Sequence, residues 1–194
     1  MQVTSKKILT LDELSAKAEE YRDSGKKVVL CHGIFDLIHA GHIRYLKSAR
    51  DQGDVLFVTL TADEFINKGP GRPVFPQELR AENLGYLSLV DFVAVNNAAT
   101  AVNVLSGIKP HAYVKGPDYK KMEDDITGGI YAEKKTVEAH GGKIVFTDDI
   151  TFSSTSLLNE HFGVFPPETK DYLKSFRQEH SHEEIISKLQ GLKN

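Results

Sequence analysis

The sequence has few of the residues and runs that mark secreted and membrane proteins. It contains one cysteine, Cys31, and no tryptophan, and a single cysteine cannot form a disulfide within the chain. We therefore expect a reducing, cytoplasmic environment, with Cys31 as a small core residue. No apolar run reaches the length of about 18 residues that a membrane-spanning helix needs, and the N-terminus lacks the apolar stretch of a signal peptide.

The chain also lacks a strong excess of charge of either sign. Its 24 Lys and Arg residues oppose 27 Asp and Glu residues, which gives a net charge of -3. This balance disfavours a protein that coats nucleic acid and leaves room for a local basic site. A content of 40% hydrophobic and 26% charged residues excludes a disordered chain. At about 100–200 residues per domain, the length predicts one domain with an appendage.

Short apolar runs rich in β-branched residues alternate with helical patterns along most of the chain. A capping box at Thr10–Glu13 opens the first predicted helix, which ends at Ser24-Gly25. The alternation predicts an α/β fold, a Rossmann-like parallel sheet with helices on both faces, whose ligands bind outside the carboxyl ends of the strands. The predicted strands cover 27–32, 55–60, 92–95, 112–114 and 144–146, and the later helices 41–52, 77–88, 100–106 and 130–139.

We expect three parts: an N-terminal helical segment over residues 1–26, a main domain over 27–162 and a short helical tail or linker over 163–194. Phe165-Pro166-Pro167 interrupts the alternation, and two short amphipathic stretches follow it. The sequence leaves open whether this tail packs on the domain, mediates dimerisation or leads into protein beyond residue 194.

Two histidines stand where the helix after the first strand begins. The chain reads HGIFDLIHAGH from residue 32 to 42, with His39 and His42 at the end. A helix N-terminus favours the binding of anions. Gly33 lets the backbone approach a phosphate closely, and Gly41 leaves the same crevice free of a side chain. Imidazoles can stabilise charge that develops on a phosphate under attack. Such a pair alone more often serves as a cap and a surface residue, but this context favours a phosphate site.

The Gly-x-Phe-Asp loop and the His-x-Gly-His motif resemble the cytidylyltransferase-like superfamily of nucleotidyltransferases. The likeness extends over residues 27–162 and is nearest to the adenylyltransferase domain of bifunctional ADP-heptose synthesis proteins. It implies a nucleoside triphosphate, a sugar phosphate acceptor and Mg²⁺ bound mainly through the nucleotide, with no metal ligands from the protein. By position, His39 and His42 would be the catalytic pair, and Gly33, Ile34 and Phe35 would touch the nucleotide through their backbone.

The resemblance extends to the segments after the second strand. Lys68 and Arg72 lie in a loop that resembles the heptose-type loop, where they would clamp phosphates, Lys68 at the catalytic centre and Arg72 at the acceptor. Without the likeness this loop is an ordinary basic turn. Arg80 matches the arginine of the family's Glu-x-Arg helix, which faces the active site. Asp36 and Asp63 are expected at the acceptor.

Two later segments also resemble the family. The run 114–119 is similar to Val-Lys-Gly-Gly-Asp-Tyr, although Pro117 replaces the second glycine and removes a donor. Lys115 and Gly116 would bind the nucleotide, and Asp118 the acceptor, unless Asp118 is a turn residue beside the proline. A hydroxyl cluster would offer donors to the triphosphate at a helix start, where a cap alone needs one hydroxyl. The cluster is Ser153, Ser154, Thr155 and Ser156.

The resemblance therefore implies an enzyme that joins ATP to a heptose-like sugar 1-phosphate and releases pyrophosphate. CTP with a polyol or sugar phosphate is the alternative. Residues 149–152 differ from the arginine and Gly-Ile of glycerol-phosphate cytidylyltransferases, which favours the heptose type. A non-catalytic nucleotide-binding module is a further alternative. As partners we expect the two substrates, a homodimer and a fused sugar-kinase domain, and neither nucleic acid nor membrane.

Overall fold

The computed structural model describes residues 6–68, 72–117 and 129–148, together with residues 168, 169, 171, 172, 175 and 176. The chain divides into two compact units, Met1–Ser154 and Thr155–Asn194. In the second unit, the described residues are helical, and the rings of Tyr172 and Phe176 stack with 6.0 Å between centroids.

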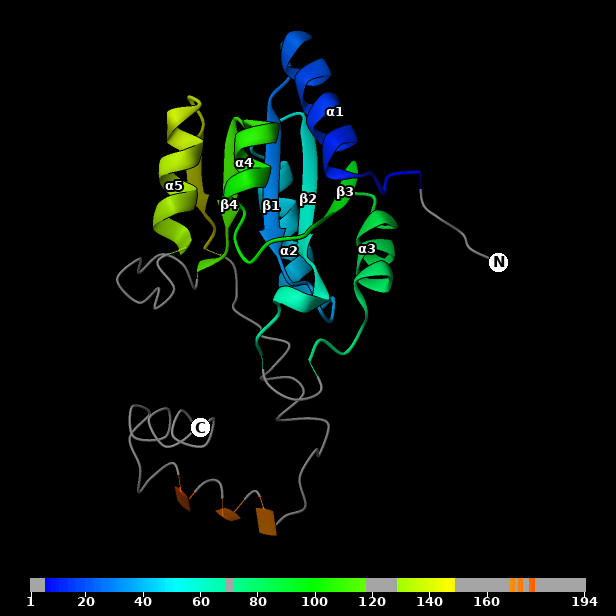
Figure 1. Cartoon of the computed structure of the whole chain (residues 1–194), viewed down its shortest axis with the longest axis vertical. Helices are drawn as coiled ribbons and strands as arrows, with labels where there is room; N and C mark the ends of the chain where they lie inside the picture. Colours follow the sequence, from blue (N-terminus) through cyan, green and yellow to red (C-terminus); the bar gives the residue numbers. More distant parts are fainter. Residues whose placement is uncertain are drawn as a thin grey trace. The chain divides into compact units, whose positions relative to one another are not determined.

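The first unit is built on a five-stranded parallel sheet, as the alternation of elements predicts (Figure 1). The strand order is β3-β2-β1-β4-β5, so the chain runs outward from β1 to one edge and then returns to build the other. Such an order puts the switch point, where ligands bind in open α/β sheets, between β1 and β4. The strands are β1 Val28–Gly33, β2 Val55–Thr61, β3 Phe92–Asn96, β4 Ala112–Lys115 and β5 Lys143–Phe146.

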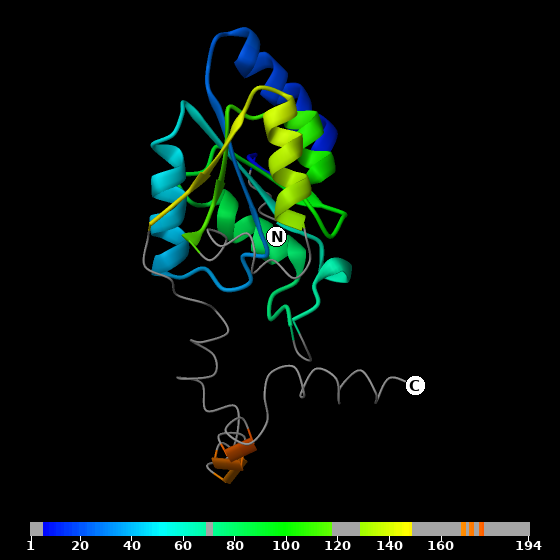
Figure 2. The same cartoon turned by 90° about the vertical axis from the view of Figure 1, so that its left-hand side faces the viewer.

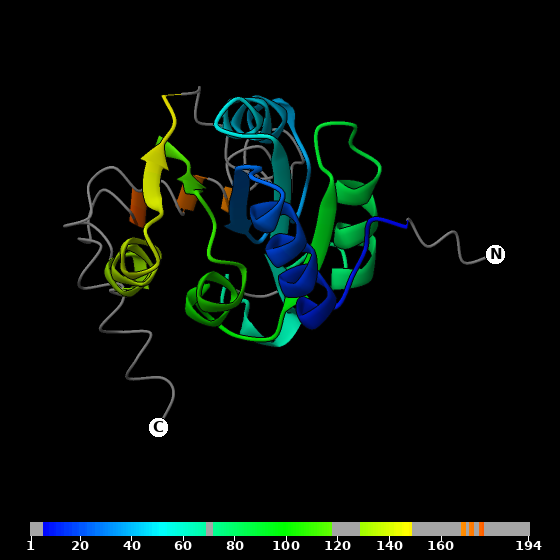
Figure 3. The same ribbon diagram turned by 90° about the horizontal axis from the view of Figure 1, so that it is seen from above.

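Helices cover both faces of the sheet. The helix pairs α1 with α4 and α4 with α5 pack together on one face, and α2 and α3 lie on the other (Figures 2 and 3). A short 3₁₀ turn, η1 Asp63–Phe65, follows β2. The helices are α1 Leu11–Asp23, α2 Ala40–Arg50, α3 Gln77–Gly85, α4 Val102–Ile108 and α5 Gly129–Ala139. None of them, in the part of the chain that the structure describes, is long and apolar enough to cross a membrane.

The core has two apolar clusters, one on each face, because successive strand residues point to opposite sides. In β1, Val28 and Leu30 join the cluster under α1, α4 and α5, while Val29 and Cys31 join the cluster under α2 and α3. Burial of each such side chain is worth about 1.5–3 kcal/mol. Burial also raises the pKa of the Cys31 thiol to about 12, which excludes it as a nucleophile at neutral pH.

The five strands and five helices predicted between residues 10 and 146 are all present, and the differences lie at their ends; the helix start expected at 153–156 and most of the predicted tail lie outside the described residues. The capping box at Thr10 and Glu13 is confirmed in both of its hydrogen bonds. The helix expected over 100–106 instead runs over Val102–Ile108. Ala101 is the N-cap of this helix, and its backbone N–H donates a hydrogen bond to Glu133 Oε1 of α5 at 2.9 Å. A cap supplied from 32 residues away leaves no local signal in the sequence.

Candidate active site

The two histidines of the motif lie face to face at the N-terminus of α2. Their rings are stacked, with 3.9 Å between centroids and 26° between planes. His39 is the N-cap, and its Nδ1 accepts a hydrogen bond from the backbone N–H of His42 at 3.4 Å. Because Nδ1 accepts, neutral His39 carries its proton on Nε2, where it is a donor for an anion.

Burial keeps both imidazoles neutral at pH 7. It lowers the pKa of His42 to about 4, and repulsion from Lys68, and from His39 when His39 is protonated, acts in the same direction. Burial also lowers the pKa of His39. The Nδ1 atom of His42 is buried and has no hydrogen-bond partner among the described residues. The pair therefore offers neutral hydrogen-bonding groups at a helix end that attracts anions.

The aromatic side chain of Phe35 packs beside the ring of His42. Phe35 has a positive φ of 51°, an uncommon conformation for a bulky residue, and its ring lies 5.3 Å from that of His42 and 6.4 Å from that of Tyr45. The Tyr45 hydroxyl donates to the carbonyl of Val114 on β4 at 2.6 Å. A Cβ at Gly33 would stand 3.2 Å from the Phe35 ring. Glycine at position 33 therefore admits this ring, in addition to any backbone approach by a ligand.

The aspartate of the loop after β1, Asp36, holds another loop of the protein. Asp36 is 3% exposed. Its Oδ2 accepts from Arg72 Nε at 2.6 Å, and its Oδ1 accepts from the backbone N–H groups of Val74 at 2.7 Å and Phe75 at 3.2 Å. The Arg72 side chain is itself only 10% exposed. Asp36 and Arg72, both expected to bind the acceptor, are brought together as an ion pair that fixes residues 72–75 to the loop after β1.

Arg80 is fully buried, with no exposed surface. It donates to the carbonyls of Phe75 and Thr61 at 3.1 and 2.8 Å, to the carbonyl of Ile34, and to Asp63 Oδ1 at 2.6 Å. These groups come from the first loop, the end of β2, η1 and the segment before α3. The geometry does not fit the expected direct contact between Arg80 and phosphate, because its donors face protein acceptors.

Lys115, at the carboxyl end of β4, is also buried and lies 3.1 Å from Glu133 Oε2. Burial opposes the ionisation of Glu133, but Lys115, the Ala101 N–H and the Tyr113 hydroxyl together hold the pKa of that carboxyl below its usual value. Beside Lys115, a Cβ at Gly116 would meet nothing within 4 Å, so the backbone there borders open space. Lys68 is exposed and close enough to affect the pKa of His42.

Sequence reasoning missed two buried polar groups at this edge of the sheet. His32 Nδ1 lies 3.0 Å from Thr59 Oγ1 and its Nε2 lies 3.3 Å from Thr61 Oγ1. Burial, with the charge of Lys115, lowers the pKa of His32 to about 4. The threonine pair, two residues apart in an otherwise apolar strand, is a signal that could have predicted a polar partner. Glu133 had no such signal, because helix residues of its type are usually solvated.

Five of the expected site residues lie outside the described residues: Asp118, Ser153, Ser154, Thr155 and Ser156. The described part of the chain contains no group of three or more His, Cys, Asp or Glu side chains that could hold a metal ion. Asp36 and Asp63 are each paired with an arginine.

Comparisons with known proteins agree with this arrangement. Residues 30–160 match the model of the family described as cytidylyltransferase-like. The chain is 39% identical over 152 residues to the bifunctional protein HldE of Methylobacillus flagellatus, which covers 77% of this chain and 30% of that protein. It is 40% identical over 140 residues to HldE of Shigella sonnei, and this match covers 71% of this chain and 28% of that protein. The chain spans about a third of the length of these relatives.

Two solved structures share the fold. A lipopolysaccharide core biosynthesis protein from Thermoplasma volcanium superposes with a TM-score of 0.54 at 26% identity, covering 66% of this chain and all of that one. Pantoate-beta-alanine ligase from Francisella tularensis, at 16% identity and a TM-score of 0.52 over 87% and 85% of the two chains, supports the fold alone. The Rossmann-like fold and the resemblance carried by the Gly-x-Phe-Asp and His-x-Gly-His motifs are confirmed.

Proposed function

The chain belongs to the cytidylyltransferase-like family, and we propose that it is a nucleotidyltransferase that joins ATP to a heptose-like sugar 1-phosphate. The products are pyrophosphate and an ADP-sugar. The observation that carries the proposal is the stacked pair His39 and His42 at the N-terminus of α2, two neutral imidazoles at an anion-attracting helix end. The similarity to bifunctional HldE proteins favours ATP and a heptose phosphate over CTP and a polyol phosphate.

The reaction is an in-line displacement at the α-phosphorus of ATP. A phosphate oxygen of the sugar 1-phosphate forms the new P–O bond, while the bond from the α-phosphorus to the oxygen that bridges the β-phosphate breaks, and its electron pair leaves with pyrophosphate. A phosphate monoester is mostly dianionic at pH 7, since its second pKa is about 6. The nucleophile is therefore already ionised, and no residue has to remove a proton from it.

Charge stabilisation is then the task of the protein. Nε2–H of His39 and the imidazole of His42 would hydrogen-bond to the α-phosphate oxygens and the departing bridge oxygen, with the first-turn N–H groups of α2 beside them. Neutral imidazoles suit this role better than a base, because a group with a pKa of about 4 is a poor proton acceptor at pH 7. Gly33, Ile34 and Phe35 would present backbone groups to the nucleotide.

The remaining cations fall into two groups in this proposal. Lys68 and Lys115 with Gly116, together with the hydroxyls of residues 153–156, would contact phosphates. For Lys115 this requires its ammonium to turn from Glu133 toward the ligand. Arg72 and Arg80 are positioning residues, since their buried hydrogen bonds are made to protein atoms. Asp63 and Asp118 complete the expected acceptor side.

Mg²⁺ would be held by the triphosphate oxygens and water. The residues present fit this mode, since the aspartates of the described site are paired with arginines and form no metal cluster. When bound, the ion neutralises charge on the triphosphate. The other parts of the proposal are a reducing, cytoplasmic setting, a fused sugar-kinase domain as in the bifunctional relatives, and a homodimer.

The experiment is a pyrophosphate-release assay on the purified chain with each of ATP, CTP, GTP and UTP against a panel of sugar and polyol phosphates. We expect turnover with ATP and a heptose 1-phosphate. His39→Asn and His42→Asn should each lower kcat by about 100-fold or more, the cost of removing one preorganised donor. Glu19→Gln, at an exposed position of α1 outside the candidate active site, is the control and should leave kcat unchanged.

Three results would go against the proposal. Turnover with CTP and a polyol phosphate alone would reassign the substrates. Tight nucleotide binding with no turnover on any acceptor would identify a non-catalytic module. Near-normal kcat in both histidine variants would remove the catalytic role of the pair.

A further inference from the structure

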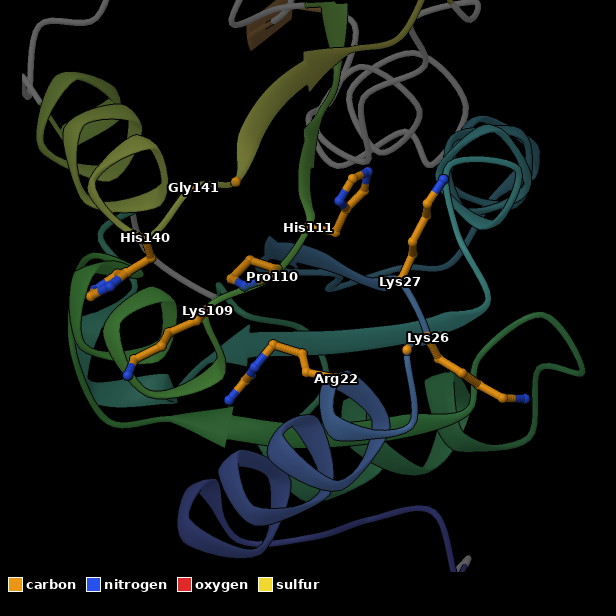
Figure 4. Close-up of a pocket in the computed structure, with 10 residues that line it drawn as sticks. Arg22, Lys26, Lys27, Lys109, Pro110, His111, His140 and Gly141 are labelled. Carbon is orange, nitrogen blue, oxygen red and sulfur yellow. The ribbon is translucent and has the colours of Figure 1, made fainter.

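A second concave site lies at the opposite end of the sheet from the histidines. It has a volume of about 270 Å³ and is formed where β1, β4 and β5 begin and where α1, α4 and α5 have just ended. Figure 4 shows most of the residues that surround it, which come from three separate turns of the chain. They are Arg22, Gly25, Lys26, Lys27, Lys109, Pro110, His111, His140, Gly141 and Gly142.

The lining is strongly basic. One arginine, three lysines and two histidines are present, and among these described residues there is no Asp or Glu. In Figure 4 the side chains of Lys27 and His111 extend in one direction and those of Arg22 and Lys109 in another. In a chain with a net charge of -3, four permanent positive charges around one cavity make a local exception.

Most of these cationic side chains form no ion pair with another described residue. Arg22 donates to the carbonyl of Ile108 at the end of α4. The described residues provide no ion pair or side-chain hydrogen bond for Lys26, Lys27 or Lys109. The nearest engaged carboxylate, Asp54, accepts from the backbone N–H of Lys27 at 2.7 Å and not from its side chain.

Helix ends account for only part of this charge. A helix C-terminus carries the equivalent of about -0.5 elementary charge, so the three that meet here offset at most about -1.5 against four permanent positive charges. One of the lysines also occupies a costly conformation: Lys109 has a φ of 49° in the turn after α4. Glycine is the usual residue at such a C-terminal turn, as at Gly25 and Gly141 in the corresponding turns of α1 and α5. A lysine there keeps a cation at the cavity despite local strain.

We propose that this cavity, defined by Lys26, Lys27, Lys109, Arg22 and His111, binds a small anion that carries two or more linked phosphate groups. The volume lies below the range of about 300–1,000 Å³ that is typical of sites for larger ligands, which favours a compact anion over a whole macromolecular segment. Four permanent positive charges in the lining match an anion that carries several negative charges better than a single phosphate group.

Recognition in this site is through side chains. The backbone N–H groups that border it are committed to the protein: those of Lys26, Lys27, His111, Gly141 and Gly142 donate to groups within the fold. Affinity should therefore depend on long-range charge and fall as salt is added, since the Debye length shortens from about 10 Å at 0.1 M to about 3 Å at 1 M.

The test uses inorganic pyrophosphate without divalent metal as the probe, followed by calorimetry and by the amide signals of glycines in a ¹⁵N-labelled chain. We expect pyrophosphate to shift the signals of Gly25, Gly141 and Gly142 in the protein whose catalytic end is impaired by His39→Asn and Lys68→Gln. Lys27→Gln combined with Lys109→Gln should weaken this binding about tenfold, because both lysines are exposed and each exposed charge pair contributes little.

Control variants separate the effect of the cavity from the effect of net charge and of misfolding. Lys6→Gln combined with Lys17→Gln removes the same charge outside the cavity and should leave the affinity within about twofold. If Lys109→Gln does not fold, Lys26→Gln with Lys27→Gln replaces it, and thermal unfolding identifies folded variants. Shifts confined to Gly33 and Gly41, or equal affinity in the cavity and control variants, would overturn the proposal. Binding of an acidic peptide without binding of pyrophosphate would overturn it in favour of a protein partner.

Discussion

Replacement of Arg80 distinguishes a positioning arginine from one that touches phosphate. Its guanidinium is fully buried and serves the carbonyls of Ile34, Thr61 and Phe75 and the carboxylate of Asp63. In Arg80→Met these acceptors lose their donors, and each buried carbonyl left without one costs about 1–3 kcal/mol, whereas the half-exposed Asp63 can turn to water. Against a total stability of about 5–15 kcal/mol, the free energy of unfolding should fall by roughly a third or more.

The assay is urea unfolding at pH 7, followed by steady-state kinetics on the folded fraction. Arg80→Lys keeps the charge but not the planar fork of donors, so we expect it to lose about 2 kcal/mol or more of unfolding free energy. Its kcat should fall because the loop that carries Ile34 and Phe35 is no longer fixed. Unchanged unfolding free energy together with a large rise in the KM for ATP would refute the reasoning and make Arg80 a phosphate contact.

Three further predictions follow from the same contacts. Asp36→Asn should lower the unfolding free energy by about 3 kcal/mol through loss of the Arg72 pair and speed proteolysis near residues 72–75; resistance equal to the parent protein would count against the pinned loop. Gly33→Ala should cost about 1–3 kcal/mol and lower kcat, because its Cβ crowds the Phe35 ring at 3.2 Å; an unaffected melting curve would contradict this. His32 has a folded pKa of about 4, below its unfolded value of about 6.5, so its contribution is complete above pH 6.5 and lost progressively as pH falls to 4. That loss amounts to about 3 kcal/mol, and urea unfolding between pH 7 and 4 should show a shallower pH dependence in His32→Gln than in the parent protein.

The sheet could be predicted from the sequence because buried parallel strands need continuous apolar runs, as in Val55–Thr61. Helix starts were predictable where the cap is local, as at Thr10, and not where Glu133 of another helix serves Ala101. In the site, the histidine pair was predictable because motif and cap lie within four residues.

The roles of the arginines were not predictable in the same way. An arginine has the same sequence signature whether it faces a ligand or protein carbonyls, and the partners of Arg80 lie 5 to 46 residues away along the chain. The same holds for Asp36, whose partner Arg72 lies 36 residues away. Contacts between residues so far apart in the sequence depend on how the loops pack against each other. The hydrophobic periodicity of the sequence carries no information about that packing.

The central claim is that the stacked imidazoles of His39 and His42 receive the α-phosphate of the nucleotide. A crystal structure of the chain with a non-hydrolysable ATP analogue and Mg²⁺ tests it most directly. The account predicts an imidazole nitrogen of each histidine within about 3 Å of an α-phosphate or bridge oxygen, the reach of a hydrogen bond. An α-phosphate seated more than one water away from both rings would contradict it.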